Sequence, residues 1–265
     1  MSKGKIVLII AGGVLCVLAV SALCILGSWG MGPLSFINDR KVAKMPGNGD
    51  SYDFSQVQTL EETPLTGKTV CFLGSSVTFG SAAMHYSLPE YFSQRTGCTV
   101  IKEAVSGTTL VDNGSNSYVQ RLKNNIDKNA SIDLLVCQLS TNDATVKNPL
   151  GTLSAETSGF DTSTVTGAME EIISYAEQTW GCPVVFFTGA HYDSAEYDAM
   201  VARTYELADK WGIGVLDLWN NSDFNDISDE DRALYMNDEI HPTKAGYLLW
   251  WCPELEYQLF EYLAQ

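Results

Sequence analysis

Two distant parts of the sequence carry the side chains needed for nucleophilic catalysis. The hydroxyl of Ser76 becomes a nucleophile once a neighbouring base takes its proton, and His241 is a candidate for that base. Asp238 lies three residues before His241, so its carboxylate can reach back to the imidazole ring if the turn between them is helix-like. A serine, a histidine and an acid that orients the histidine are the groups that transfer acyl chains. We therefore predict Ser76, Asp238 and His241 as catalytic residues.

The same chemistry needs hydrogen-bond donors for the negatively charged oxygen of its transition state. Ser76 lies where a predicted strand passes into a helix, so its own N–H can point into the site. Gly107 offers a second backbone N–H with no side chain to block it, and Asn142 offers a side-chain amide. We predict an oxyanion hole made of Ser76, Gly107 and Asn142.

Each of these residues, taken alone, has a simpler interpretation. A serine after a strand is most often a turn residue or a helix cap, and a single histidine is more often structural than catalytic. A glycine after a strand usually only relieves steric crowding, and an Asn-Asp pair usually forms a turn. The combination favours catalysis because three of the four blocks follow strands of one predicted sheet.

Five short runs rich in apolar and β-branched residues predict the strands of that sheet. They lie at residues 69–74, 99–105, 134–139, 183–188 and 214–218. Several are apolar almost without alternation, as are strands that are buried on both faces. Helical candidates alternate with them, and the clearest, 164–180 and 194–211, each carry an apolar stripe. The alternation predicts a flavodoxin-like α/β fold, a three-layer α/β/α sandwich with a central five-stranded parallel sheet.

In an open parallel sheet, ligands bind beyond the carboxyl ends of the strands. Ser76, Gly107 and Asn142 follow the first three predicted strands, and His241 lies in the long acidic loop after the fifth. His191 follows the fourth strand and could line the cleft, although a histidine at the rim with no catalytic role is the more frequent case. The fold therefore brings the candidate residues to one edge of the sheet.

The four blocks resemble those of the SGNH/GDSL hydrolase superfamily, which is named for its Ser, Gly, Asn and His blocks. The matching segments are GSSVTFG at 74–80, AVSGTT at 104–109, STND at 140–143 and DEIHP at 238–242. The resemblance covers residues 66–265. It implies Ser76 as nucleophile, Gly107 and Asn142 as oxyanion donors, and Asp238 with His241 as the acid and base.

Two positions depart from the pattern of this superfamily. Ser75 stands where the superfamily has Asp, which changes how the nucleophile loop is braced. Ser140 stands where Gly is common, so the turn at Asn142 differs in detail. Neither departure removes a catalytic group. The resemblance therefore implies a serine ester hydrolase that forms an acyl-enzyme on Ser76.

Other functions remain open at this point. An O-acyltransferase, or a lipase-like or lysophospholipase-like esterase, would use the same residues. A non-catalytic flavodoxin-like module could bind phosphate or flavin mononucleotide, with Ser75, Ser76 and Thr78 at a helix start around the phosphate, but this leaves Asn142 and the Asp238–His241 pair without a role. An inactive, glycan-binding relative is a further alternative, and the intact set of four groups argues against it. The three histidines include no HExxH motif, so we expect no metal and no cofactor.

The N-terminal part of the chain has a different composition from the rest. Residues 6–26 contain no charged residue and follow Lys3 and Lys5. At about 1.5 Å per residue, a helix of this length is about 31 Å long, the thickness of a bilayer's hydrocarbon core. The apolar region of a cleaved signal peptide is shorter. We expect a single-pass membrane anchor at 1–29, a stalk at 30–65 that wraps onto the domain, and an extracytoplasmic hydrolase domain at 66–265. A cleaved signal and a secreted protein are the alternative.

The net charge and the expected location of the protein limit the classes of partner and substrate that we expect. A net charge of −16 repels the phosphates of nucleic acid, so nucleic acid is not expected as a partner. O-acylated glycans are plentiful esters at the outer cell surface, so we expect removal of short acyl groups, above all acetyl, from carbohydrate. Phe79, Tyr192 and either Trp219 or Trp250 could stack on sugar rings if they reach the cleft. The sequence does not indicate an oligomeric state.

The seven cysteines do not have the pattern of a disulfide-stabilised domain. Cys71 and Cys137 fall inside apolar runs, where a thiol packs as a small hydrophobic group. If any pair forms a disulfide, Cys98 with Cys182 is the first to examine.

Overall fold

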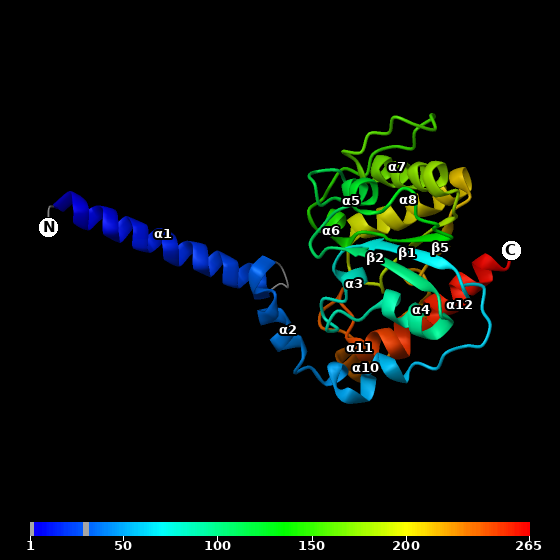
Figure 1. Ribbon diagram of the computed structural model, residues 1–265, viewed down its shortest axis with the longest axis horizontal. Helices are drawn as coiled ribbons and strands as arrows, with labels where there is room; N and C mark the ends of the chain where they lie inside the picture. The colour runs from blue at the N-terminus through cyan, green and yellow to red at the C-terminus, as the bar shows by residue number, and fades with distance from the viewer. Residues whose placement is uncertain (1–2, 29–31) are drawn as a thin grey trace.

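The computed structural model describes residues 3–28 and 32–265 (Figure 1). Its centre is a parallel sheet of five strands in the order β2-β1-β3-β4-β5. The strands are β1 (Thr69–Gly74), β2 (Thr99–Ala104), β3 (Leu134–Gln138), β4 (Val184–Phe187) and β5 (Gly214–Leu216). This is the strand order of flavodoxin-like folds. The predicted five-stranded parallel sheet is confirmed, and each predicted strand differs from the observed one by at most two residues at either end.

Helices cover both faces of the sheet (Figure 1). The helices are α1 (Lys3–Ser28), α2 (Phe36–Val42), α3 (Ser76–Phe79), α4 (Leu88–Thr96), α5 (Tyr118–Asn125), α6 (Thr141–Thr145), α7 (Val165–Trp180), α8 (Ala195–Trp211), α9 (Ser222–Asn225), α10 (Asp229–Tyr235), α11 (Lys244–Gly246) and α12 (Cys252–Leu263). In Figure 1, α5, α7 and α8 lie on one face, and α4, α11 and α12 lie on the other. The three-layer arrangement predicted from the alternation of strands and helices is therefore present.

The two longest helices of the domain begin and end at residues suited to those positions. The side chain of Thr164 accepts a hydrogen bond from the N–H of Gly167 at the start of α7, and Ser194 does the same for Tyr197 at the start of α8. Each helix ends at a glycine with positive φ, a conformation that costs other residues more. These local signals explain why both helices could be predicted from the sequence.

The sheet separates two hydrophobic cores. Val70 and Phe72 of β1 belong to one core, while Cys71 belongs to the other, as expected when successive side chains point to opposite faces. Cys98 lies in the first core and Cys182 in the second, and all seven cysteines are free. The suggested Cys98–Cys182 disulfide is therefore wrong, because the sheet lies between the two thiols.

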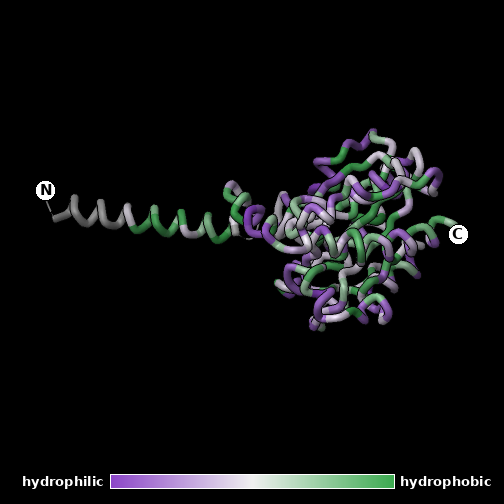
Figure 2. The backbone as a smooth tube through the Cα atoms, turned by 90° about the horizontal axis from the view of Figure 1, so that it is seen from below, coloured by the Kyte–Doolittle hydropathy of each residue, from purple (hydrophilic) through white to green (hydrophobic). Residues whose placement is uncertain are grey.

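Residues 13–28 of α1 form an apolar helix that extends away from the domain (Figures 1 and 2). Its side chains include Val14, Val17 and Leu18, all more than half exposed. By length and composition, no single helix in the described parts of the chain could cross a membrane, whereas the pair Gly13–Gly27 and Gly32–Val42, bent by 61°, could. The anchor at 1–29 stays a prediction, and residues 1, 2 and 29 lie outside the described residues.

The segment predicted as a stalk packs against the domain. Asn48 is buried, and its amide donates to the carbonyls of Val42 and Ala82, both at 2.8 Å. Its side-chain oxygen accepts from the N–H of Lys244 at 2.8 Å. One asparagine therefore joins the end of α2 to two distant loops of the domain.

Candidate active site

Ser76 lies at a sharp turn between β1 and α3. It is the first residue of α3, so the helix leaves its N–H without an intrahelical acceptor. Gly74, at the end of β1, has no room for a side chain, because a Cβ would overlap the side chains of Thr78 and Gln138. The tight turn therefore holds the Ser76 hydroxyl at the carboxyl edge of the sheet.

His241 and Asp238 meet Ser76 from the loop before α11. The Nε2 of His241 lies 2.8 Å from the Ser76 Oγ, and its Nδ1 lies 2.9 Å from both carboxylate oxygens of Asp238. The turn is a bend, not a helix, and is closed by a bridge between Met236 and Pro242. The structure thus brings together the three residues predicted as catalytic. The turn between Asp238 and His241 is not the helix-like turn we considered.

Asp238 is held as a carboxylate beside the imidazole. Burial alone would raise its pKa, but the hydrogen bond and charge of His241 lower the pKa well below its usual range. The N–H groups of Ile240 and His241 also donate to the Asp238 Oδ1, each at 2.9 Å, and lower the pKa further. An ionised Asp238 favours the tautomer with a proton on Nδ1, which leaves Nε2 free to accept the serine proton.

The predicted oxyanion donors line the same pocket as the hydrogen-bonded residues Ser76, His241 and Asp238. The pocket has a volume of about 270 Å³ and is lined by Ser76, Gly107, Asn142 and His241, among others. The N–H of Gly107 donates to no acceptor among the described residues, and Gly107 has a positive φ of 79°. The structure therefore brings the predicted donors to one cavity beside the serine.

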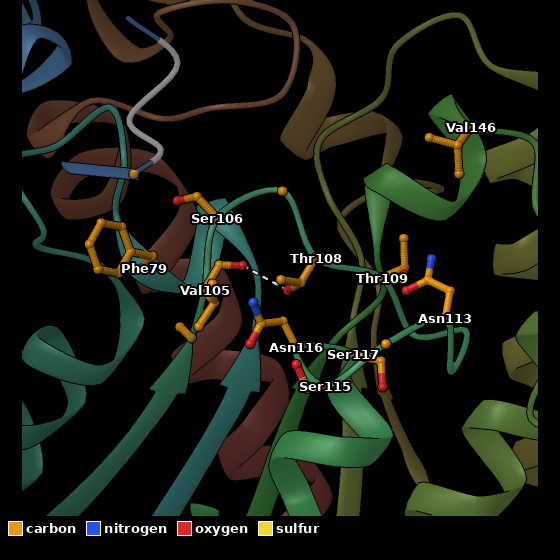
Figure 3. A pocket seen from close by; sticks show the side chains of 14 residues that line it. Phe79, Val105, Ser106, Thr108, Thr109, Asn113, Ser115, Asn116, Ser117 and Val146 are labelled. Carbon is orange, nitrogen blue, oxygen red and sulfur yellow. Dashed lines mark hydrogen bonds between the residues drawn. The ribbon is translucent and has the colours of Figure 1, made fainter. Parts of the chain in front are cut away.

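The loop that carries Gly107 is fixed on both sides. The amide of Asn142 donates to the carbonyl of Thr108 at 2.8 Å, which uses one of its two hydrogens and leaves the other for a ligand. The Thr108 hydroxyl donates to the Val105 carbonyl at 2.7 Å (Figure 3). These contacts hold the Gly107 N–H in place before any substrate arrives.

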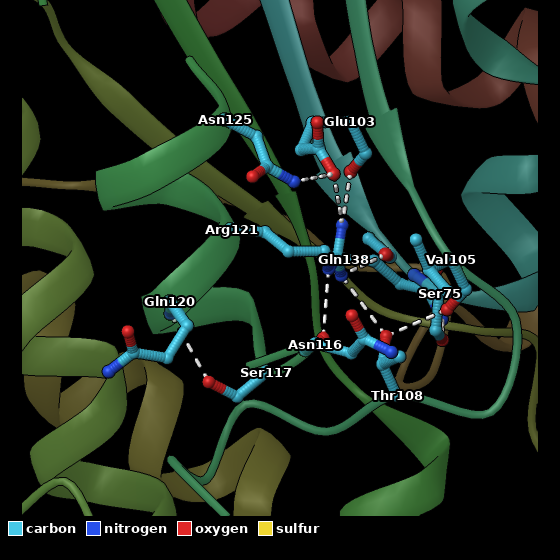
Figure 4. Close-up of polar contacts among 11 residues, drawn as sticks. Ser75, Glu103, Val105, Thr108, Asn116, Ser117, Gln120, Arg121, Asn125 and Gln138 are labelled. Carbon is cyan, nitrogen blue, oxygen red and sulfur yellow. Dashed lines mark hydrogen bonds and ion pairs between the residues drawn. The ribbon is translucent and has the colours of Figure 1, made fainter. Parts of the chain in front are cut away.

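Gln138 braces the turn that carries Ser76. Its Oε1 accepts from the N–H of Ser75 and from the N–H and hydroxyl of Thr78, at 2.9–3.0 Å. Its Nε2 donates to the Ser75 hydroxyl at 3.1 Å (Figure 4). Ser75, which stands where the superfamily pattern has Asp, is therefore part of this brace. Our sequence analysis missed Gln138, although a polar residue at the carboxyl end of an apolar strand is a detectable signal.

Arg121 connects the ends of two strands with the loop beyond them (Figure 4). Its guanidinium is almost completely buried and donates to the carbonyls of Gly74 and Glu103, at 2.7 and 2.9 Å, and to the Glu103 carboxylate at 3.1 Å. It also donates to the hydroxyl of Thr108 at 3.0 Å and to the carbonyl of Asn116 at 2.9 Å. Arg121 was missed as well, because its partners lie on separate loops and strands, the most distant, Gly74, 47 residues away.

Asp143 supports the stretch that follows Gly107. Its buried carboxylate accepts from the N–H of Leu110 at 2.7 Å and of Val111 at 3.3 Å, and from the amide of Asn148 at 2.7 Å. Burial raises the pKa of Asp143, while these donors oppose the rise. The residue after Asn142 thus has a structural part in the site.

Helix α2 supplies one wall of the pocket, which the sequence analysis did not anticipate. Asn38 and Lys41 of α2 line the catalytic pocket together with Ser76. The Asn38 amide donates to the carbonyl of Ser81 at 2.7 Å, and Asp39 lies 3.2 Å from the ring of His85. Lys41 forms no ion pair with any described residue.

Most of the aromatic residues proposed for sugar stacking lie elsewhere. Trp219 and Trp250 are buried in the two cores and do not reach the catalytic pocket, so they pack the protein interior, the more frequent role of such residues. Tyr192 packs edge-on against Trp219, whereas Phe79 does line an open cavity beside the site. His191 is exposed and its ring lies against Trp219, at 4.5 Å between centroids, outside the catalytic pocket. No group of three His, Cys, Asp or Glu side chains in the described part of the chain could hold a metal.

A serine, histidine and aspartate joined by hydrogen bonds at the carboxyl edge of this sheet define a serine hydrolase of the α/β/α class. Residues 72–249 match the GDSL-like Lipase/Acylhydrolase family, and the chain belongs to this family. The protein is therefore an ester hydrolase. No curated protein matches the chain.

Several solved structures share the fold. A protein from Lactobacillus plantarum aligns with a TM-score of 0.59 at 19% identity, over 75% of this chain and 97% of that chain. A protein assigned to the G-D-S-L family of lipolytic proteins, from Desulfitobacterium hafniense DCB-2, aligns with a TM-score of 0.55 at 16% identity, over 74% of this chain and 99% of that chain. A protein classed as a GDSL-like lipase, from Bacteroides uniformis ATCC 8492, aligns with a TM-score of 0.52 at 15% identity, over 75% of this chain and 96% of that chain. Similarity at this level of identity establishes the fold alone.

Proposed function

We propose that the protein hydrolyses esters through an acyl-enzyme on Ser76. The observation that carries this proposal is the 2.8 Å contact between the His241 Nε2 and the Ser76 Oγ, with Asp238 on the other ring nitrogen. His241 takes the hydroxyl proton as Ser76 attacks the carbonyl carbon, and then gives that proton to the leaving alcohol. Water, activated by the same imidazole, releases the acyl group from Ser76 in the second half of the reaction.

The oxyanion is bound by the N–H groups of Ser76 and Gly107 and by the amide of Asn142. Donors fixed before the reaction stabilise the transition state without any cost of reorganisation. The tethers from Asn142 and Arg121 to Thr108 support this role, because they hold the loop next to Gly107. A non-catalytic binding module would leave this arrangement without a use.

We propose that the acyl group is short, acetyl above all. An apolar cavity adjoins the backbone of the catalytic residues. Its lining includes Val77, which follows Ser76, and Ile240, which precedes His241, as well as Phe187 and Trp251. It measures only about 10 Å³, room for about one water molecule. The catalytic pocket itself has polar walls that include Asn38 and Ser81. Neither space suits an acyl chain of eight or more carbons, which argues against a lipase-like role.

We further propose that the alcohol part is carbohydrate and that the domain lies outside the cytoplasm, anchored by α1. The support is the row of exposed apolar side chains on α1, which would be stabilised by a hydrocarbon surrounding at about 25 cal/mol per Å². The acidic surface of the protein also disfavours anionic lipid as a substrate. A sugar hydroxyl in place of water would turn the same site into an O-acyltransferase.

A chain-length series of p-nitrophenyl esters tests the acyl preference. The full chain in detergent should hydrolyse acetyl and propionyl esters with a higher kcat/KM than C8–C12 esters. The Ser76→Ala variant serves as the blank for each ester. A higher kcat/KM for C8–C12 would reject the short-acyl proposal and favour a lipase-like function.

A further inference from the structure

A second cavity of about 720 Å³ opens beside the catalytic pocket and shares Ser106 and Gly107 with it (Figure 3). We call it the polar groove. Its walls are the loops 104–109 and 113–117, with Phe79, Val146 and Gly32 at the sides. Its volume falls in the range of roughly 300–1,000 Å³ that is usual for small-molecule sites. Because it adjoins Gly107, a molecule bound in it would reach the oxyanion hole.

Among the described residues, the lining of the polar groove contains no charged side chain, although the protein has 32 acidic and 16 basic residues. An ionic ligand would therefore find no counter-charge in it. The walls combine hydroxyls, amides and backbone with the apolar side chains of Phe79, Val105 and Val146, and apolar atoms contribute more of the accessible lining than polar atoms do. This combination suits a neutral ligand that carries both hydroxyl groups and apolar faces.

Several polar side chains of the polar groove are free to bind such a ligand. Those of Asn113, Ser115 and Asn116 are exposed and form no hydrogen bond with the described protein. The hydroxyl of Ser106 is buried and has no partner among the described residues. A buried hydroxyl without a partner is energetically unfavourable, so a ligand that supplies the partner gains binding energy.

Phe79 adds an apolar surface at one side of the polar groove, with Asn113 toward the other side (Figure 3). One part of its ring packs against His85, with ring centroids 4.6 Å apart, so the ring is held in position. A pyranose ring has an apolar face of C–H groups that packs on such a side chain, while its hydroxyls reach the amides and hydroxyls.

The polar groove is organised before a ligand binds. Arg121 holds the carbonyl of Asn116 at 2.9 Å and the hydroxyl of Thr108 at 3.0 Å, so one buried side chain supports both loops (Figure 4). A binding surface that is already ordered loses less entropy when it binds.

We propose that the polar groove binds the sugar that carries the scissile ester, a neutral oligosaccharide, with Asn116 and Phe79 as its main contacts. This inference rests on the proposed function, since it places the alcohol part of the substrate beside Gly107 and the ester carbonyl over Ser76. It adds that selectivity for the sugar resides in this cavity and not in the catalytic pocket.

The test compares a sugar ester with a small ester in the full chain. Mono-O-acetylated xylotriose and cellotriose are the neutral probes, acetylated trigalacturonate is the anionic probe, and p-nitrophenyl acetate reports on the chemistry. Loss of one hydrogen bond usually costs about 0.5–1.5 kcal/mol, so Asn116→Ala should raise the KM for neutral sugar esters about fivefold. The double variant Asn116→Ala/Phe79→Ala should lower the ratio of kcat/KM values, sugar ester over p-nitrophenyl acetate, at least tenfold. The anionic probe should be the poorer sugar substrate of the wild type.

The matched control is Asn129→Ala, another exposed asparagine, outside the lining of the polar groove. It should keep the wild-type ratio. Calorimetric titration of the Ser76→Ala protein with the acetylated trisaccharides should show binding that the double variant loses.

Each contrary outcome points to a different error. A double variant with the wild-type ratio and wild-type affinity would overturn the groove proposal, while activity of the wild type on sugar esters would still support the proposed function. A wild type that cleaves p-nitrophenyl acetate but no sugar ester, or that prefers the anionic probe, would overturn the groove proposal too. Hydrolysis of p-nitrophenyl acetate by Ser76→Ala would overturn the mechanism itself.

Discussion

At the scale of single residues, the site depends on one hydroxyl among several polar neighbours. Ser75 and Ser76 are adjacent and both buried, but only the Ser76 hydroxyl lies within 2.8 Å of the His241 Nε2. The Ser75 hydroxyl instead accepts from Gln138. Adjacent serines therefore have different partners, the catalytic histidine candidate for Ser76 and the Gln138 brace for Ser75.

This separation predicts different outcomes for two alanine variants. Ser76→Ala should abolish ester hydrolysis and labelling by a fluorophosphonate, because no other hydroxyl among the described residues forms a hydrogen bond with the His241 Nε2. Ser75→Ala should keep measurable activity and labelling, because it removes one hydrogen bond of the brace at a cost of about 1 kcal/mol. Equal labelling of the Ser76→Ala protein would show that the nucleophile is another residue.

The lowered pKa of Asp238 predicts a pH dependence of stability. A carboxylate whose pKa is depressed by folding stabilises the protein above its unfolded value of about 3.9, and this contribution is lost as the pH falls through the folded value. Asp238→Asn should therefore lower the melting temperature at pH 7, and its difference from the wild type should shrink as the pH falls below about 4. Thermal denaturation followed by circular dichroism measures both. A difference that grows on acidification would contradict the assigned direction.

At the scale of elements, α2 lines the catalytic pocket although it precedes all the strands of the sheet in the sequence. Asn38 and Lys41 line the pocket, the Asn38 amide holds the carbonyl of Ser81, and Asn48 ties the end of α2 to the domain. The segment between the apolar helix and the domain therefore forms part of the pocket wall, and we expect it to contribute to activity.

Truncation on either side of α2 tests this role. A protein that starts at residue 45 lacks the pocket wall, whereas one that starts at residue 32 keeps it. We expect the shorter protein to have a kcat/KM for p-nitrophenyl acetate lower by about tenfold, because small losses of positioning reduce rates strongly. Asn38→Ala and Lys41→Ala in the longer protein show which side chain matters. Equal kcat/KM values for the two truncated proteins would mean that α2 does not contribute.

At the scale of the whole molecule, the apolar part of α1 and the folded domain require different surroundings. Exposed side chains such as Val17 and Leu18 suit a hydrocarbon environment, while the acidic domain suits water. Lys3 and Lys5 before the apolar run favour a cytoplasmic N-terminus.

We therefore predict that the protein stays in the membrane fraction after a carbonate wash. Protease added outside intact cells should remove the domain, because the domain is expected on the extracytoplasmic side. Its ester-hydrolase activity should be released into the medium by the same treatment. A soluble protein shortened by about 30 residues would favour a cleaved signal sequence instead.

The sequence by itself determined the strands, the long helices and the catalytic blocks of this protein. Strands and helices follow from the spacing of apolar residues and from caps such as Thr164, which are properties of neighbouring positions. Ser76, Gly107, Asn142 and His241 could be predicted because each follows, in chain order, an element that a parallel sheet brings to one edge.

Only the tertiary structure decided how these residues are held and what surrounds them. Gln138, Arg121 and Asn38 contact partners 43 or more residues away or on other elements, and no local pattern encodes such contacts. The polar groove and the burial of Trp250 likewise result from the packing of separate elements. The physical reason is that periodicity along a chain specifies which face of an element is apolar, whereas the partner of a polar group depends on which distant segments fold against it.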